Sequence, residues 1–485
     1  METSTFKLIE ATIEDIQQAF REQKLTSVEL VQAYLDRIEA YDKNGPKINS
    51  VRAINPDALA IAAELDDKRG QDGQGPLYGI PVLLKDNIET KDPMPTTAGA
   101  IALEHNFAKE DAFVAKQLRE AGAIVLGKVN LSEWAYFMSQ DGPSGYSSLA
   151  GQVKNPYGID VFEPEDVGGS SSGTGAAIAS NFAVVGVGTE TSGSILSPSS
   201  ANSIVGIKPT VGLISRSRII PIAESQDTAG PMARTVADAA ILLGAMTGVD
   251  EQDPATLKSE GQALTDYTPH LKKDGLKGAR IGVDLSFLNN EAPEERAIMD
   301  AAIEQIKALG ATVVKLTIPQ KDFESDVLWY EFKRGVNDYL ASTPDDVPVK
   351  SLADVIDFNK QDPERRMKFG QAVLDKAQSL SDDPNDATYL EHRDIDFRSS
   401  TAEGIDLVMH EHQLDALLFQ NNRGAAMPAK AGYPSITVPA GYTEDGHPVG
   451  VTFSARAFSE ARLIELAYSY EQATKKRIVP DLESY

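Results

Sequence analysis

The sequence predicts an α/β protein, a single large domain in which helices cover both faces of a mixed, largely parallel β-sheet. Short apolar runs typical of buried strands alternate with amphipathic helical segments over most of the 485 residues. No internal repeat or low-complexity linker divides the chain. The length and the alternation together predict one large core rather than a string of separate modules.

The first 70 residues are predicted to form a helical region that packs on this core. Thr12 and Thr26 each precede an acidic residue by three positions, which is the spacing of a helix capping box. A third helix is predicted near residues 57–68. A polar, glycine-rich segment follows it, so we expect the main domain to comprise residues 71–485.

Within the main domain, the hydrophobic pattern predicts strands and helices in alternation. The predicted strands lie at residues 79–87, 124–126, 183–187, 204–208, 280–283, 312–316, 416–420, 435–438 and 449–453. The predicted helices lie at residues 111–120, 235–246, 293–309 and 460–474, and a further helix begins near residue 176. Residues 320–412 lose the strand pattern and become charged, which predicts a helical excursion over the sheet.

The composition excludes several classes of function. The 46 basic and 72 acidic side chains leave a net charge of −26, which argues against nucleic acid or an anionic membrane surface as a partner. The absence of cysteine excludes disulfides, thiolate metal sites and a cysteine nucleophile. Residues 1–10 lack a signal-peptide pattern, and no apolar run approaches the roughly 18 residues of a membrane span. We therefore expect the protein to be cytoplasmic. We further expect it to be a monomer or a homodimer.

Two clusters of glycine and serine, at residues 168–175 and 189–199, are the least ordinary part of the chain. A phosphate-binding loop is disfavoured because no lysine follows the glycines in the required spacing. The G-x-S-x-G pattern centred on Ser171 fits a nucleophile elbow with His447 as base, but acidic residues and a proline stand where an elbow needs an apolar strand. A purely structural interpretation is also open: the glycines in the two clusters would then only allow tight packing and take part in no chemistry.

A further interpretation adds Lys85, which ends the apolar run of the first predicted strand in the main domain. A serine hydroxyl needs a base, and none of the six histidines lies in a Gly/Ser-rich context. His410 and His412 alternate on a predicted helix, so their side chains diverge and indicate a solvated face rather than a metal site. Burial lowers the pKa of a lysine and makes it a base near neutral pH, whereas a snorkelling or ion-paired lysine is the structural alternative.

The same segments resemble the amidase signature family. The G-G-S-S-S-G-T-G-A-A-I-A segment at residues 168–179 and G-x-G-T-E-T-S-G-S-I-L-S-P-S at residues 186–199 resemble the family signature. The G-I-P-V-L-L-K-D-N segment at residues 79–87 is similar to the lysine-bearing strand of the family. Three further stretches of the chain, at residues 205–216, 225–240 and 431–442, also resemble segments of the family. The likeness therefore covers about residues 10–480. The resemblance implies the amidase signature fold, with no metal and no other cofactor.

The family's catalytic triad, carried over residue by residue, implies Ser194 as nucleophile, Ser170 as the bridging serine after a cis peptide bond, and Lys85 as base. The resemblance also implies that backbone N–H groups hold the oxyanion, and these belong to Thr191, Ser192, Gly193 and Ser194. Predicted substrate-binding residues are Ser171 and three large side chains that can line either the core or a pocket, namely Trp134, Phe137 and Met138.

The resemblance implies hydrolysis of a linear carboxamide to a carboxylic acid and ammonia through an acyl-enzyme. The E-T-x-G-S-I, L-S-E-W-A and S-Q-D-T-A-G-P-M segments are most similar to peptide amidases, so C-terminal peptide amides are the leading substrates among peptide and small-molecule amides. Many members have arginine where this chain has Leu196, which weakens the case for a glutamate-like substrate and for an amidotransferase A subunit. The alternatives are an aryl or aliphatic acylamidase, an elbow-type esterase and a non-catalytic binding subunit.

Overall fold

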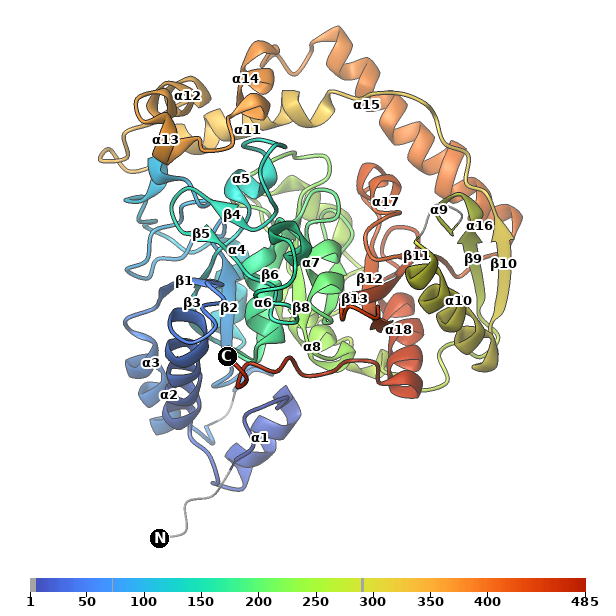
Figure 1. Ribbon diagram of the computed structural model, residues 1–485, viewed down its shortest axis with the longest axis horizontal. Helices are drawn as coiled ribbons and strands as arrows, with labels where there is room; N and C mark the ends of the chain where they lie inside the picture. The colour runs from blue at the N-terminus through green and yellow to red at the C-terminus, as the bar shows by residue number, and fades with distance from the viewer. Residues whose placement is uncertain (1–5, 72, 289–291) are drawn as a thin grey trace.

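The centre of the molecule is one mixed β-sheet (Figure 1). The structure is a computed structural model that describes residues 6–71, 73–288 and 292–485. In these residues eleven strands follow one another in the order β1-β3-β2-β6-β8-β7-β12-β13-β11-β9-β10. Their bounds are β1 Val51–Ile54, β2 Pro81–Lys85, β3 Ile124–Val129, β6 Val185–Glu190, β7 Val205–Lys208, β8 Thr228–Ala233, β9 Arg280–Asp284, β10 Thr312–Leu316, β11 Ala416–Gln420, β12 Ser435–Tyr442 and β13 Pro448–Ser454. The predicted mixed α/β sheet is confirmed.

Parallel pairing occurs in two parts of this sheet. Strand β2 pairs in parallel with β3 and β6, and β9 pairs in parallel with β10 and β11. The strands between these groups pair antiparallel. Because β2 and β6 are parallel, with Leu84 opposite Val187, the residues that end both strands meet at the same edge of the sheet. Lys85 and Thr189 therefore come together there.

Two strands of the sheet were not predicted. Strand β1 lies in the first 70 residues and pairs with β3 at the edge of the sheet. Strand β8 lies between β6 and β7, and its Pro231 stands opposite Val187. Proline is rare in a central strand because it cannot donate a ladder hydrogen bond, so the local pattern favoured a break before the following helix.

Helices pack on both faces of the sheet, as predicted (Figure 1). On one face lie α4 (Phe113–Glu120), α8 (Val236–Met246), α10 (Pro293–Ala308) and α18 (Glu460–Thr474). The other face is covered by α6 (Ser172–Ala179) and α7 (Leu196–Ala201), which contact each other. Every residue of α6 is buried, and a Cβ at Gly173 would lie 2.2 Å from the Asn130 carbonyl oxygen. Small residues therefore let α6 approach the sheet closely.

The first 70 residues share the main core. The capping boxes at Thr12 and Thr26 are both present, and they start α1 (Ile13–Arg21) and α2 (Ser27–Arg37). The third predicted helix is α3 (Ala58–Asp67). Apolar side chains of all three helices join the same buried cluster as the sheet. The N-terminal helices thus pack directly on the body that carries the two Gly/Ser clusters.

Residues 327–411 form a helical layer beside the sheet. Its helices are α11 (Val327–Ala341), α12 (Leu352–Lys360), α13 (Pro363–Arg366), α14 (Ala372–Ser379), α15 (Ala387–Ser400), η6 (Thr401–Ile405) and α16 (Asp406–Glu411). In Figure 1, α15 passes along the top of the molecule between α14 and α16. Shorter elements include β4 (Tyr146–Ser147), β5 (Gly151–Gln152), α5 (Glu133–Tyr136), η3 (Pro164–Val167), α9 (Leu285–Leu288) and α17 (Ala426–Ala431). Among the described residues, no helix has the length and apolarity to cross a membrane.

Candidate active site

Lys85 lies at the end of β2 and is completely buried. Its Nζ contacts the Ser170 Oγ at 2.8 Å and the Thr189 Oγ1 at 2.9 Å. Ser170 comes from the first Gly/Ser cluster and Thr189 from the second. The predicted base therefore joins the two clusters that the sequence singled out.

Burial sets the protonation of Lys85. Loss of water around the ammonium lowers the pKa of Lys85 to about 7, although the negative charges of Asp227 and Glu190 oppose this shift. Near pH 7 a large fraction of the amine is therefore neutral, and a neutral amine has a lone pair that can accept a proton. The contact with the Ser170 hydroxyl provides a proton donor.

Ser170 follows a cis peptide bond from Gly169, as the family resemblance implied. Only 1% of Ser170 is exposed, and its carbonyl accepts a hydrogen bond from the Ser132 N–H at 3.1 Å. The serine therefore lies in a closed site, and its hydroxyl is directed at Lys85. Helix α6 begins two residues later.

Ser194 lies in the turn between β6 and α7 and is half-buried. Its carbonyl accepts a hydrogen bond from the Ser171 N–H at 3.2 Å, which ties the second cluster to the residue after Ser170. The structure therefore brings Lys85 and Ser170 into direct contact and links the backbone of Ser194 to the first cluster.

The turn around Ser194 is built on Glu190, a buried carboxylate. Its two oxygens accept hydrogen bonds from the N–H groups of Gly193 at 2.6 Å, Ile195 at 2.7 Å and Leu196 at 3.0 Å. Gly193 has φ +85°, a conformation that favours glycine. The Gly193 N–H, one of the four predicted oxyanion donors, thus already has an acceptor, and the remaining predicted donors are Thr191, Ser192 and Ser194.

The other side of this turn is held by the segment before β8. The Thr191 hydroxyl donates to the Asp227 Oδ1 at 2.5 Å, and the Gln226 Nε2 donates to the Thr191 carbonyl at 3.1 Å. Burial raises the pKa of Asp227 to about 6, while hydrogen bonds from the Thr191 hydroxyl and from the Ile222 and Ala223 N–H groups lower it. Sequence reasoning assigned no role to Glu190 or Asp227. The only indication of a role in the sequence is that Glu190 lies in the E-T-x-G-S-I segment and Asp227 in the S-Q-D-T-A-G-P-M segment.

The predicted pocket residues lie mainly in the core. Trp134, Phe137 and Met138 are at most 8% exposed and pack against the helical layer, where the Phe137 ring lies 4.6 Å from that of Phe332. Ser171 is fully buried, and its hydroxyl donates to the Thr189 carbonyl at 3.0 Å. A substrate role for these four residues stays a prediction.

The geometry gives no support to a nucleophile elbow at Ser171. The hydroxyl of Ser171 is enclosed and bonded to the backbone of Thr189. The ring of His447 instead stacks on Phe162, and its Nε2 lies 3.1 Å from the Asp166 Oδ2. Among the residues that the structure describes, no group of three or more His, Cys, Asp or Glu side chains is arranged to hold a metal ion.

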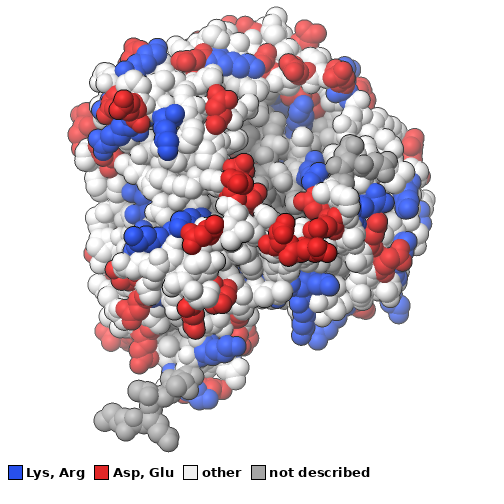
Figure 2. Space-filling view, in the orientation of Figure 1, with Lys and Arg blue, Asp and Glu red and all other residues white. Residues whose placement is uncertain are grey.

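Two hollows adjoin the turn that carries Ser194. One is a cavity of about 200 Å³ lined by Asn87, Thr189, Thr191 and Asp227 among others. The second, of about 570 Å³, is lined by Ser197, Asn422 and five acidic residues, namely Glu165, Asp166, Glu294, Glu295 and Asp445. Figure 2 shows that this face is hollowed, with acidic side chains gathered beside the hollow.

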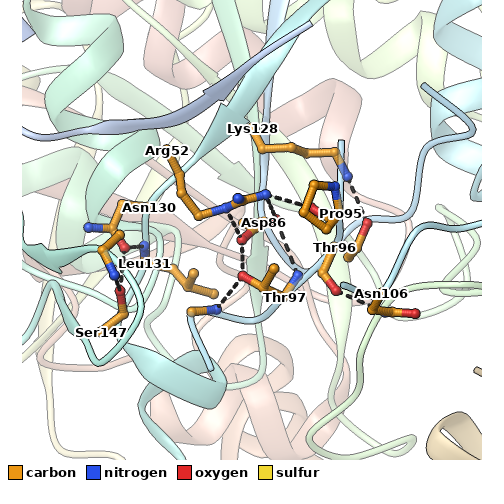
Figure 3. Close-up of polar contacts among 12 residues, drawn as sticks. Arg52, Asp86, Pro95, Thr96, Thr97, Asn106, Lys128, Asn130, Leu131 and Ser147 are labelled. Carbon is orange, nitrogen blue, oxygen red and sulfur yellow. Dashed lines mark hydrogen bonds and ion pairs between the residues drawn. The ribbon is translucent and has the colours of Figure 1, made fainter. Parts of the chain in front are cut away.

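A second polar network lies behind the end of β2 (Figure 3). Asp86, the residue after Lys85, pairs with Arg52 at 2.5 Å and accepts a hydrogen bond from the Thr97 hydroxyl. The buried Lys128 donates to the Ile88 carbonyl and, at 3.0 Å, to the Thr96 hydroxyl. Burial lowers the pKa of Lys128 to about 8. This network holds the backbone that follows the strand.

Comparison with known proteins gives one consistent family. Residues 29–464 match the family described as Amidase. A probable amidase of Arabidopsis thaliana is 41% identical, over 99% of this chain and 93% of that protein. An amidase family protein from Bacillus anthracis superposes with a TM-score of 0.92 at 41% identity, covering 98% of this chain and 93% of that one. The peptide amidase from Stenotrophomonas maltophilia superposes with a TM-score of 0.91 at 43% identity, covering 98% and 99%.

Proposed function

The chain belongs to the amidase family, and we propose that it is a serine amidohydrolase that converts linear carboxamides to carboxylic acids and ammonia through an acyl-enzyme on Ser194. The observation that carries the proposal is the 2.8 Å contact between the buried Lys85 Nζ and the Ser170 Oγ, beside the turn that bears Ser194. A base with a pKa near 7 and a hydroxyl that can pass on a proton are what a serine nucleophile needs.

In the proposed mechanism, neutral Lys85 accepts a proton from Ser170, which accepts one from Ser194 as the Ser194 oxygen attacks the amide carbonyl. The carbonyl oxygen becomes an oxyanion that the remaining backbone N–H groups of the turn stabilise. The carbon–nitrogen bond then breaks, and the proton returns through Ser170 to the departing nitrogen. Water, activated by the same two residues, attacks the acyl-enzyme and releases the acid.

Neutral, peptide-like amides are the proposed substrates, with C-terminal peptide amides first and aryl or aliphatic amides second. Leu196 stands where many members have arginine, and it is buried against Phe419 and Ala425. The five acidic residues around the larger hollow repel a substrate carboxylate. An amidated C-terminus has no such charge, and the likeness to a peptide amidase supports the same class.

The test compares two serines. Ammonia release is measured with amidated dipeptides, anilides and short aliphatic amides. We expect Ser194→Ala to lose at least about 10⁴-fold in kcat, while Ser171→Ala keeps most turnover because its hydroxyl is enclosed in the core. Mass spectrometry should find the acyl group on Ser194 only. Turnover that survives Ser194→Ala but not Ser171→Ala would instead indicate the elbow-type esterase. A protein that hydrolyses no amide and copurifies with a stoichiometric partner would indicate a non-catalytic subunit.

A further inference from the structure

Gln226 and Asp227, which directly precede β8, hold Thr191 by two of its polar groups. The Gln226 Nε2 donates to the Thr191 carbonyl at 3.1 Å, and the Thr191 hydroxyl donates to the Asp227 Oδ1 at 2.5 Å. Thr191 is buried and belongs to the turn that bears Ser194. Two neighbouring side chains therefore fix the orientation of one predicted oxyanion donor.

The second oxygen of Asp227 anchors this contact to another loop. Its Oδ2 accepts hydrogen bonds from the N–H groups of Ile222 at 2.8 Å and Ala223 at 2.9 Å. The two oxygens thus have different partners: a hydroxyl, which can donate or accept a hydrogen bond, and two backbone N–H groups, which can only donate. Asp227 therefore ties the Ser194 turn to residues 222–223 through a half-buried carboxylate.

Asp227 also acts on the base. It lines the cavity of about 200 Å³ together with Thr189, whose hydroxyl and carbonyl oxygens contact the Lys85 Nζ at 2.9 and 3.3 Å. In the described chain the hydrogen bonds of Lys85 all go to uncharged oxygens, so a negative charge acts on it through space. Burial raises the pKa of Asp227 to about 6, and its carboxylate is therefore mostly charged at pH 7.

Two carboxylates act on Lys85 in the part of the chain that the structure describes, Asp227 with the larger effect and Glu190 with the smaller. The charged groups on the neighbouring elements are engaged elsewhere. Asp86, the next residue along the chain, is held in the network of Figure 3. Lys128 on β3 extends to the opposite side of the sheet, and α6 carries no charged residue. Asp227 is therefore the main negative charge that faces the base.

Resting on the amidase activity proposed above, we infer that Asp227 is a positioning residue for the reaction, which fixes Thr191 in its turn and provides the negative charge that balances protonated Lys85. The attack on the amide moves a proton from Ser170 onto Lys85, which creates a positive charge in a buried site. A buried cation is costly unless a carboxylate lies near it, so the charge of Asp227 stabilises this state. The proton returns to the departing nitrogen in the next step, and no bond forms at Asp227.

The hydrogen-bond pattern allows the charge to be removed by itself. In Asp227→Asn the amide oxygen can accept the N–H groups of Ile222 and Ala223, and the NH₂ group can donate to the Thr191 hydroxyl. The same exchange at Glu190 fails, since both of its oxygens accept backbone N–H groups. Asp227→Asn therefore keeps the turn while it removes the negative charge.

The experiment measures kcat/KM for an amidated dipeptide from pH 5 to 9 in the wild type and in Asp227→Asn. Without the carboxylate the ammonium form of Lys85 is less stable, so the pKa of Lys85 falls and the midpoint of the profile should move to lower pH by about 0.5–1.5 units. The plateau at high pH should fall about tenfold, because protonated Lys85 loses its counter-charge. Asp227→Ser, a smaller uncharged variant, should move the midpoint in the same direction.

Glu224 provides the matched control. It lines the same cavity, is exposed, and its Oε1 lies 3.7 Å from the Arg334 Nη2. Glu224 is not one of the charges that act on Lys85, which agrees with the screening of an exposed carboxylate by water and salt. Glu224→Gln removes one negative charge from the same cavity wall, and it should leave both the midpoint and the plateau unchanged.

The contrary outcomes are distinct. A folded Asp227→Asn protein with the wild-type midpoint would overturn the inference, even if its rate were lower at every pH, because Asp227 would then be a structural contact only. An equal shift of the midpoint in Glu224→Gln would also overturn it, since any lost charge would have the same effect. A wild type that hydrolyses no amide would instead contradict the proposed activity. NMR titration of the Lys85 side chain in Ser194→Ala, with and without Asp227→Asn, should show the same downward shift independently of turnover.

Discussion

Lys85 and Lys128 lie on neighbouring strands and differ in chemistry although their burial is the same. Both are completely buried, and burial lowers their pKa values to about 7 and about 8. In the parallel pairing of β2 with β3, Lys128 stands opposite Leu84 rather than opposite Lys85. Successive side chains of a strand point to opposite faces, so this offset of one residue sends the two lysines to opposite sides of the sheet.

The consequence is a different set of partners. Both lysines contact hydroxyl and carbonyl oxygens: Lys85 contacts the Ser170 and Thr189 hydroxyls and the Thr189 carbonyl, whereas Lys128 contacts the Thr96 hydroxyl and the Ile88 carbonyl. The difference is the Ser170 hydroxyl, which can exchange its proton and belongs to the cluster linked to the Ser194 turn, whereas Thr96 lies outside the Gly/Ser clusters. Burial by itself therefore makes a lysine easier to deprotonate. A base also needs a neighbour that delivers a proton and a substrate beside that neighbour.

Replacing each lysine by methionine should separate the two environments most clearly. Lys85→Met removes the base, and we expect kcat/KM for amide hydrolysis to fall about 10²- to 10⁴-fold. Lys128→Met should keep activity within about tenfold but lower the free energy of unfolding by about 1–3 kcal/mol, because the buried Ile88 carbonyl and Thr96 hydroxyl each lose the lysine as a donor. Initial rates and denaturant unfolding of both variants measure the contrast. Equal activity of the two variants would remove the distinction between the lysines.

A smaller loss is expected when the turn, rather than the base, is disturbed. Glu190→Gln puts an NH₂ group where one carboxylate oxygen accepts the Gly193 N–H or the other accepts those of Ile195 and Leu196. The turn must then shift, and we expect kcat to fall about 10- to 100-fold while Lys85 keeps its contacts. Steady-state kinetics measure this. A rise in KM with kcat unchanged would argue that Glu190 positions the substrate and not the oxyanion donors.

The pH dependence tests the base without any substitution. Only neutral Lys85 accepts a proton, and its pKa is lowered to about 7, so kcat/KM should rise with pH up to about pH 8. Below pH 7 the neutral fraction, and with it the rate, falls about tenfold per unit. A profile of kcat/KM recorded from pH 5 to 9 should have its midpoint near pH 7 in the wild type and in Lys128→Met alike. A rate that declines between pH 6 and pH 8 would contradict a lysine base.

Much of the fold follows from local sequence features, and these were predicted correctly. The capping boxes at Thr12 and Thr26 depend on residues three positions apart. The buried strand that ends at Lys85 is a continuous apolar run. Strand β8 was missed because Pro231 is unusual in a central strand, and β1 because its pairing with β3 joins distant parts of the chain. Sheet neighbours of this kind cannot be read from a local pattern.

The chemistry of the site likewise depends partly on local sequence and partly on contacts that form only in the folded chain. The residue types available for chemistry are evident from the sequence alone: a lysine at the end of an apolar strand, two clusters of small and hydroxylated residues, and no cysteine. Which lysine meets a serine depends on the fold, because an offset of one residue between β2 and β3 sends the two lysines to opposite sides of the sheet. The fold also reveals that Glu190 and Asp227 hold the Ser194 turn, since these contacts join segments distant in the sequence or depend on how a turn folds.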